Sequence, residues 1–443
     1  MADVRPFRGL RYGPAFEQEL NRVIAGPFDV ISPAEQKALY AQSAHNIIRV
    51  ELGEILPSDS DAENRYTRAA ALLHAWLAEQ AIVLDPVPAF YVSHHTFDVD
   101  GATHSRMELY GQVRLEEWDK KVVLPHEFTL PGAKVDRLHL LRAVKTNVSP
   151  VYSLYNDKGG AIARLLQSHT AGAPLLTVSG FRDASFEVWA ITDPAVAAAI
   201  ASALSDQRLY IADGHHRYET ALNYRNERRA AGDGDGDEPH NFMLMALTAV
   251  DDPGLVVLPL HRLLRGLTGE AMQGLMGGLD QDWVVQRVPF HSDADVASVT
   301  QQLRASAAEP SFALYGVEPA TMLMVRPKST AALRAQLPAG MAEPLKELDL
   351  SLLHELLFHQ YLGIGRTPAD VERSLGFEPL AAEAVHQVDS GAYQVAVLVN
   401  ATRVGQMVAV ADAGEKMPQK STFFFPKLPT GLVLRPAEAL APA

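Results

Sequence analysis

One short stretch near the middle of the chain constrains the fold more than any other. The apolar run at residues 209–212 ends abruptly in Asp213 and Gly214, and a helical pattern begins at His215. This order is typical of a β-strand, a tight turn and the first turn of an α-helix. In α/β proteins such a joint exposes backbone N–H groups and forms a natural anion site. The stretch therefore predicts an α/β fold whose active region lies at the turn.

The polar residues at this joint have complementary chemistry. Gly214 allows a close backbone approach, and Arg217 can give two parallel hydrogen bonds to phosphate or carboxylate oxygens. Asp213 can bind Mg²⁺ or accept a proton from a hydroxyl, while His215 or His216 can donate to a phosphoryl oxygen or carry a proton. Adjacent histidines diverge by about 100° on a helix, which disfavours a shared zinc ion. A plain turn with capping histidines is the alternative, and the clustering favours a functional site.

Composition excludes several classes of function. With 443 residues the chain exceeds the usual size of one hydrophobic core, so two or three domains are expected. The net charge of −14 makes nucleic acid an improbable partner, because that binding depends on neutralising phosphates. The absence of cysteine excludes disulfides, thiolate catalysis and cysteine-ligated metals. With no apolar run of about 18 residues and no signal pattern, a cytoplasmic protein without membrane association is expected.

The patterns along the chain predict three units. Residues 1–173 and 266–443 are interpreted as mixed α/β units, and residues 174–265 as a central unit that carries the strand–turn–helix. Asp193-Pro194 opens a helix in that central unit. The expected fold class is thus mixed α/β. The sequence leaves the oligomeric state open.

Several local elements follow from spacing and turn chemistry. Ser32 and Glu35 have the spacing of a capping box and predict a helix to about residue 42. Residues 46–52 are interpreted as a strand. Extended runs at 89–97 and 103–116 flank an Asp-Gly hairpin turn. A long helix is expected at about 344–362.

A second polar segment spans residues 126–137. Its ionisable residues stand beside Pro and Gly, which favours a shaped loop, with a short helix after it. Glu127 is a candidate general base, and Lys134 and Arg137 are candidate anion contacts. A loop held by internal salt bridges is the alternative interpretation.

A third polar segment closes the chain. Lys420 and Ser421 are candidate phosphate contacts, and with Lys416, Thr422 and Lys427 they could fold over a phosphate as a lid. The alternative is a solvated charged turn before an aromatic strand. Two histidine or aspartate patterns elsewhere lack metal-site spacing: His354 and His359 stand five residues apart on an apolar helix, and residues 233–239 lack the glycine of a calcium loop.

The central motif resembles a known signature. Asp213-Gly214-His215-His216-Arg217 is similar to the motif of the ParB/sulfiredoxin-like superfamily, particularly its free serine kinases. In those kinases a similar strand, motif and helix meet nucleotide phosphates and Mg²⁺. The resemblance covers about the middle quarter of the chain. ParB partition proteins carry a Gly-Glu-Arg-Arg type box and a helix-turn-helix, neither of which is present here.

A wider set of motifs resembles the bacterial and archaeal domain-of-unknown-function family 1015 over nearly the whole chain. The shared segments occur in this order: Pro27-Phe28-Asp29-Val30-Ile31, His126-Glu127-Phe128-Thr129, Lys134-Val135-Asp136-Arg137, Asn147-Val148-Ser149-Pro150, the central motif, and Met417-Pro418-Gln419-Lys420-Ser421-Thr422-Phe423-Phe424. This family brings no settled activity.

Together, the residues and the kinase-like motif predict an enzyme that transfers or hydrolyses a phosphoryl group on a small hydroxylated metabolite such as serine. Mg²⁺ and a nucleotide (ATP, ADP or CTP) are the expected cofactors. Asp213 is the expected metal ligand, and His216 and Arg217 are expected to stabilise the transferred charge. Two alternatives stay open: a non-catalytic nucleotide switch, and a ParB-like protein associated with nucleic acid.

Overall fold

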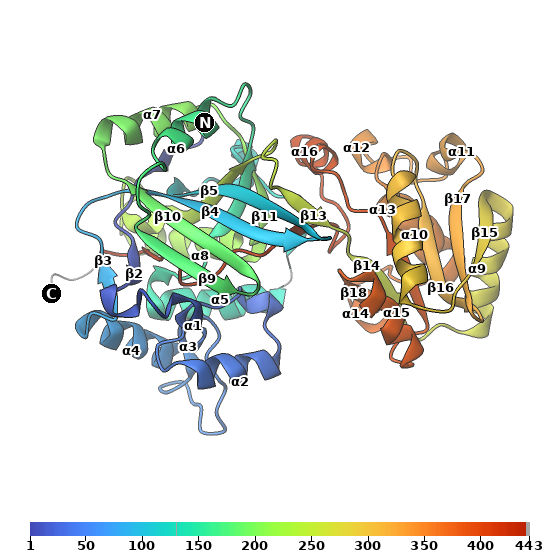
Figure 1. Ribbon diagram of the computed structural model, residues 1–443, viewed down its shortest axis with the longest axis horizontal. Helices are drawn as coiled ribbons and strands as arrows, with labels where there is room; N and C mark the ends of the chain where they lie inside the picture. Colours follow the sequence, from blue (N-terminus) through green and yellow to red (C-terminus); the bar gives the residue numbers. More distant parts are fainter. Residues whose placement is uncertain (130, 440–443) are drawn as a thin grey trace. The chain divides into compact units, whose positions relative to one another are not determined.

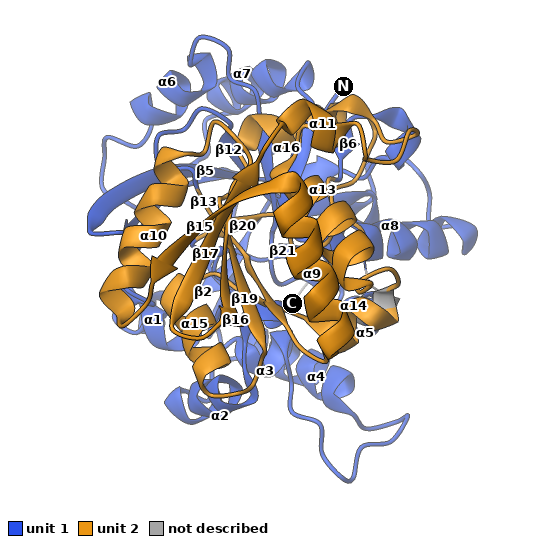
Figure 2. Cartoon of the chain, turned by 90° about the vertical axis from the view of Figure 1, so that its right-hand side faces the viewer, with its two compact units in different colours: residues 1–125, 129–256, 426–443 blue, residues 126–128, 257–425 orange. Residues whose placement is uncertain are grey.

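The computed structural model describes residues 1–129 and 131–439, so Leu130 of the second polar segment and residues 440–443 lie outside the described residues. The chain is mixed α/β (Figure 1). It forms two compact units, coloured separately in Figure 2. Unit 1 contains residues 1–125, 129–256 and 426–443, and unit 2 contains residues 126–128 and 257–425.

This division differs from the three expected ranges. Strands β11 (Leu209–Asp213) and β12 (Phe242–Ala249) come from the expected central unit, yet each pairs with β8 (Val151–Tyr155) from the expected first unit. A continuous hydrogen-bonded sheet therefore joins the two ranges. Residues 426–443 also return to unit 1.

Unit 1 is built on a nine-stranded mixed sheet. β11 lies between β6, to which it is parallel, and β8, to which it is antiparallel, while β8 and β12 are parallel. In spatial order the strands are β6 (Val123–Leu124), β11, β8, β12, β5 (Ala102–Arg114), β4 (Phe90–Val99), β10 (Ala184–Ile191) and β9 (Leu176–Phe181), with β1 (Val4–Arg5) also paired to β5. Shorter strands are β2 (Leu10–Tyr12), β3 (Ile82–Leu84), β7 (Thr146–Asn147) and β21 (Arg435–Pro436).

The helices of unit 1 surround this sheet. They are α1 (Leu20–Val23), α2 (Pro33–Gln42), α3 (Ile48–Glu51), α4 (Arg65–Ala78), α5 (Pro131–Val144), α6 (Ala161–Ser168), α7 (Pro194–Ser205) and α8 (His215–Ala230). Apolar side chains of α6, α7 and α8 join strand residues in one buried cluster, which includes Leu166, Ile200, Ile211 and Leu222. This core fixes the start of α8 against the end of β11. Within the described part of the chain, no helix has the length and apolarity that crossing a lipid bilayer requires.

The local predictions for unit 1 are confirmed in two places and wrong in two. Ser32 accepts a hydrogen bond from the backbone N–H of Glu35 at 3.2 Å, and β4 and β5 form the expected hairpin, with Asp100 at φ 51°. Residues 46–52 are not a strand but carry the short helix α3, because the Asn46 carboxamide accepts from the Ile48 N–H and starts a helical turn. The segment expected to be a loop is helical from residue 131, as α5.

Unit 2 is an antiparallel sheet with helices on both faces. The strands, in spatial order, are β15 (Trp283–Pro289), β17 (Thr321–Pro327), β16 (Phe312–Glu318), β19 (Val395–Val399), β14 (His261–Leu264) and β18 (Leu375–Glu378). Successive residues of β16 enter different cores: Phe312 and Leu314 pack with α9 (Gly269–Asp282), and Ala313 packs with α10 (Asp293–Ala305). This alternation follows the two-residue period of a strand. The remaining elements are α11 (Thr330–Arg334), α12 (Glu343–Lys346), α13 (Asp349–Leu352), η5 (Leu353–Leu362), α14 (Pro368–Ser374), α15 (Ala381–Asp389), α16 (Val404–Asp412), β13 (Val256–Leu258) and β20 (Phe423–Phe425).

The long helix expected at about 344–362 is interrupted. Leu348 adopts an extended backbone, with φ −80° and ψ 132°, and separates α12 from α13. The buried Leu348 side chain explains why the apolar spacing continues across the break. Beyond α13 the chain forms the π-helix η5, on which His354 is buried.

The carboxyl of Asp349 makes the stability of unit 2 depend on pH. Burial raises the pKa of this carboxyl to about 6, against the opposing charges of Arg403 and Arg334. The folded state then binds more protons than the unfolded state between the unfolded pKa of about 3.9 and pH 6, so stability falls as the pH rises through this window, by roughly 3 kcal/mol. Asp349→Asn should remove this part of the pH dependence of urea unfolding, and the exposed Asp280→Asn should leave it. An unchanged dependence in Asp349→Asn would contradict this assignment.

Candidate functional site

The strand–turn–helix at residues 209–230 forms as the sequence predicts. β11 ends at Asp213, Gly214 turns the chain at φ 92°, and the 16-residue helix α8 begins at His215. The turn needs glycine for two reasons. A positive φ disfavours residues with a Cβ, and a Cβ at this position would lie 3.0 Å from the guanidinium carbon of Arg217. Arg217 therefore folds back over its own turn.

Two cations converge on the Asp213 carboxylate. Arg217 Nη2 donates to Asp213 Oδ2 at 2.5 Å, and the Lys427 ammonium donates to Oδ1. The side chains are 14% (Asp213), 9% (Arg217) and 11% (Lys427) exposed, so this group of three is mostly shielded from water. Burial acts to raise the pKa of Asp213, but the charges of Lys427, Arg217 and His215 outweigh it and hold that pKa well below its usual range. Asp213 is therefore ionised throughout the physiological pH range.

A buried polar network adjoins the motif within unit 1. Arg137 Nη1 lies 3.3 Å from the Glu51 carboxylate, and Ser149 Oγ donates to the same carboxylate at 2.9 Å. Ser149 also shares a hydrogen bond with Thr430 at 2.6 Å. Burial raises the pKa of Glu51 in spite of the charges of Arg137 and Arg217. Because Arg217 acts on both carboxylates, the network and the motif form one charged cluster.

A small cavity lies between this network and the motif. Its volume is about 40 Å³, and its lining includes Glu51, Arg137, Ser149, Arg217 and Thr220. The structure thus brings one residue of the second polar segment, Arg137, to the motif. The Arg137 guanidinium also stacks over the Phe28 ring at 4.1 Å, which fixes its position.

Lys134 reaches α8 but contacts a different residue. Its Nζ lies 2.7 Å from Glu219 Oε1, and the Thr129 hydroxyl donates to the other Glu219 oxygen at 2.5 Å. Glu219 stands two residues beyond Arg217, so Lys134 lies near the motif. Its charge is balanced by the Glu219 carboxylate.

Glu127, Lys420 and Ser421 belong to unit 2, where Glu127 and Ser421 are in direct contact. The Ser421 N–H donates to Glu127 Oε1 at 3.0 Å, and the Ser421 hydroxyl donates to the Pro418 carbonyl at 2.5 Å. His126 Nε2 lies 2.8 Å from the Thr422 hydroxyl. The structure therefore joins the second and third polar segments to each other in unit 2. From the third segment, Lys427 is part of unit 1 and contacts Asp213.

Sequence reasoning missed Glu51 and did not place Lys427 beside Asp213. The sequence gives no sign that Glu51 belongs to the site, because residues 46–52 resemble a strand. Lys427 and Asp213 are 214 residues apart along the chain. Among the described residues no group of three or more His, Asp or Glu side chains is arranged to hold a metal ion. His359 pairs with Glu355 at 3.2 Å on its own helix.

Gly214 provides a test of the turn. Gly214→Ala should lower the stability of unit 1 by about 2 kcal/mol, because the Cβ strains a positive φ and displaces Arg217. Gly232→Ala is the matched control, since Gly232 also has a positive φ (93°) but has no atom within 4 Å of an added Cβ. The Gly232→Ala variant should lose only about 1 kcal/mol of folding stability. Equal losses in thermal unfolding would show that Arg217 is not held against the turn.

Comparison with protein families identifies the chain. The family described as "Protein of unknown function (DUF1015)" matches residues 4–351. The chain belongs to this family. The expected resemblance to family 1015 is therefore confirmed. No curated protein matches the chain.

Several solved structures show a partial similarity to this DUF1015 chain. A free serine kinase variant in complex with ADP is 12% identical, with a TM-score of 0.33, and the alignment covers 71% of this chain and 86% of the kinase. SbnI with a C-terminal truncation from Staphylococcus aureus is 11% identical, with a TM-score of 0.34, covering 74% and 88%. A conserved hypothetical protein from Pyrococcus furiosus is 12% identical, with a TM-score of 0.32, covering 73% and 93%. With TM-scores below 0.5, function has to be inferred from the residues of this chain.

Proposed function

We propose that unit 1 is a cytoplasmic, Mg²⁺-dependent, nucleotide-binding enzyme that transfers or hydrolyses a phosphoryl group on a small hydroxylated metabolite. One observation carries the proposal: an ionised carboxylate, Asp213, lies between two shielded cations at the N-terminus of a 16-residue helix. The helix N-terminus and the two cations favour an anion, and the carboxylate favours a cation. A phosphate bound together with a divalent cation presents both charges at once.

The donor set fits Mg²⁺ in the manner of nucleotide enzymes. Magnesium in such sites is usually held by one or two carboxylates, with phosphate oxygens and water completing the shell. Asp213 supplies one carboxylate, and its lowered pKa keeps it charged without a metal. The same lowered pKa makes Asp213 a weak proton acceptor, so its role as metal ligand is favoured over activation of a hydroxyl. Bound Mg²⁺ would neutralise charge on the phosphates.

The neighbouring residues have the chemistry to hold phosphate. Gly214 allows an oxygen to approach the first N–H groups of α8, and Arg217 can give parallel hydrogen bonds to two oxygens. Lys427 adds a second positive charge from the closing segment. His215 and His216, in the first turn of α8, complete the proposed set of phosphate-binding residues. On nucleotide binding, the two cations would exchange Asp213 for phosphate oxygens.

Lys427 tests the phosphate side of this site. Lys427→Met should weaken binding of ATP with Mg²⁺ by about tenfold or more, since a charge-assisted contact is lost. Lys120→Met is the control, because Lys120 is an exposed lysine elsewhere in unit 1. Titration calorimetry gives both dissociation constants. Equal affinities in the two variants would remove Lys427 from the site.

Turnover is the test of the proposed reaction. The full chain would be incubated with Mg²⁺ and ATP, ADP or CTP, with and without L-serine, which the motif at residues 213–217 makes the first acceptor to try. ³¹P NMR should show loss of the terminal phosphoryl group, with phosphoserine or inorganic phosphate as the product. Binding of the nucleotide with no product from serine or from a panel of hydroxylated metabolites would favour the non-catalytic switch instead.

A further inference from the structure

Unit 1 contains a second, larger cavity at the other end of β8. Its volume is about 340 Å³, within the range of small-molecule sites. It is lined where β8 and β12 end, by Tyr155 and Ala249, which are paired in the sheet. Asp213 pairs instead with Tyr152. Tyr152 stands three residues before Tyr155 on β8, which is roughly 10 Å along the strand. The cavity is therefore separate from the proposed phosphate site.

The wall of this cavity is acidic. Asp157, Asp251 and Asp252 line it, and Arg106 is the one lysine or arginine among its lining residues. The Arg106 guanidinium is paired with the Glu108 carboxylate at 2.9 Å, so its charge is already balanced. Two of the aspartates are fixed by backbone donors. Asp157 accepts from the N–H groups of residues 162 and 163, and Asp252 accepts from those of residues 107 and 254.

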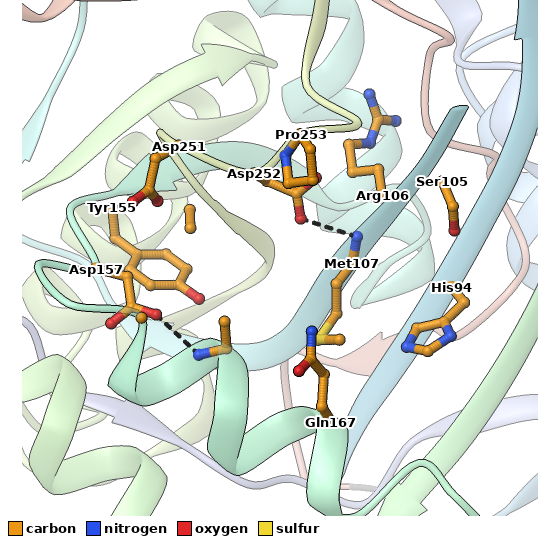
Figure 3. A pocket seen from close by; sticks show the side chains of 13 residues that line it. His94, Ser105, Arg106, Met107, Tyr155, Asp157, Gln167, Asp251, Asp252 and Pro253 are labelled. Atoms are coloured by element: carbon orange, nitrogen blue, oxygen red, sulfur yellow. Dashed lines mark hydrogen bonds between the residues drawn. The ribbon is translucent and has the colours of Figure 1, made fainter. Parts of the chain in front are cut away.

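Polar groups on the wall are oriented toward the same space. Figure 3 shows the Tyr155 hydroxyl, at the end of β8, and the Gln167 amide, on α6, directed into it. Tyr155 is only 2% exposed, and its pKa is raised by burial and by the charges of Asp157, Asp252 and Asp251. On the opposite wall, His94 Nε2 is buried and has no hydrogen-bond partner among the described residues. A buried polar atom left in this way indicates a bound group that satisfies it.

We propose that this cavity binds a short aliphatic diamine, or a closely related small organic cation. The carboxylates of Asp157, Asp251 and Asp252 stand around the wall, and a carboxylate already holding one backbone donor on each oxygen can still accept an ammonium N–H. Met107, Ala163 and Ala249 supply apolar surface for a methylene chain. A metal ion held by side chains alone does not fit, because no group of three acidic or histidine side chains in the described chain converges to hold one.

The test uses 1,4-diaminobutane as the probe in titration calorimetry on the full chain. Wild type should bind it, and 1,4-butanediol, which has the same length without charge, should not bind. The double variant Tyr155→Phe/Asp251→Asn should weaken binding by about tenfold or more, because it removes one hydroxyl and one charge. Its melting temperature should stay close to that of wild type, since phenylalanine keeps the ring of Tyr155 and Asp251 is exposed.

The control is Asp206→Asn, which removes an exposed negative charge of unit 1 outside the cavity. It should bind the diamine as wild type does. Three results would overturn the proposal: no binding of the diamine to wild type, equal binding of the diol, or equal weakening in the control. Because the cavity and the Asp213 site are separate, binding of ATP with Mg²⁺ should be the same in the double variant and in wild type.

Discussion

Asp213→Asn should lower phosphoryl turnover by about 10²- to 10³-fold, equivalent to roughly 3–4 kcal/mol of lost transition-state stabilisation. The amide keeps the shape of the side chain but loses the charge that would hold Mg²⁺. It also loses the charge that positions Arg217 and Lys427. Steady-state assays at saturating nucleotide measure the effect. Asp206→Asn, an exposed carboxylate of the same unit, is the matched control and should keep wild-type turnover.

Asparagine is a better test here than alanine. From the sequence, Asp213→Ala is expected to leave the fold intact. Both variants remove the charge between the two shielded cations, but asparagine keeps one acceptor oxygen and alanine keeps none, so alanine destabilises the folded state more. Circular dichroism and thermal unfolding should therefore accompany the assay. A folded Asp213→Asn protein with near wild-type turnover would remove Asp213 from the mechanism.

Arg435→Met should destabilise unit 1 by about 3–5 kcal/mol. Arg435 is 2% exposed, and it donates to Gln112, Asn147 and the carbonyls of Phe242 and Pro239 at 2.7–3.2 Å. Methionine fills the space but leaves these buried acceptors without donors. The change in free energy of unfolding can be measured by urea denaturation.

Arg142→Met is the control for this prediction. Arg142 pairs with Glu227, but the two side chains are 46% and 42% exposed, so the ion pair should contribute under about 1 kcal/mol. A similar small loss in Arg435→Met would show that the closing residues of the chain are not anchored in unit 1 through this guanidinium.

The parts of the site that depend on local signals could be predicted from the sequence. Residues 209–217 carry a strand pattern, a turn that requires glycine and a helix start within a few residues, and the structure has all three there. The capped helix after Ser32 and the hairpin after Val99 are similar cases. In each, the determining contacts lie within a few residues of one another, so spacing alone reveals them.

The parts that depend on distant contacts could not be predicted. The pairing of Lys427 with Asp213 and of Glu51 with Arg137 is fixed by how the sheet and α5 bring separate segments together. Residues 46–52 are misleading for a local reason, because Ile47, Ile48 and Val50 are all buried and do not show a helical pattern. The two-unit division likewise follows from sheet pairing rather than from sequence boundaries.

The most direct test of the central claim is thermal unfolding of wild type, Asp213→Asn and Asp206→Asn with Mg²⁺ and ATP, ADP or CTP. A ligand at 100 times its dissociation constant adds about 2.7 kcal/mol to the folded state, enough for a clear rise in melting temperature. We expect a nucleotide- and Mg²⁺-dependent rise in melting temperature in wild type and Asp206→Asn that is lost in Asp213→Asn. No rise with any nucleotide in wild type, or an equal rise in all three proteins, would contradict it.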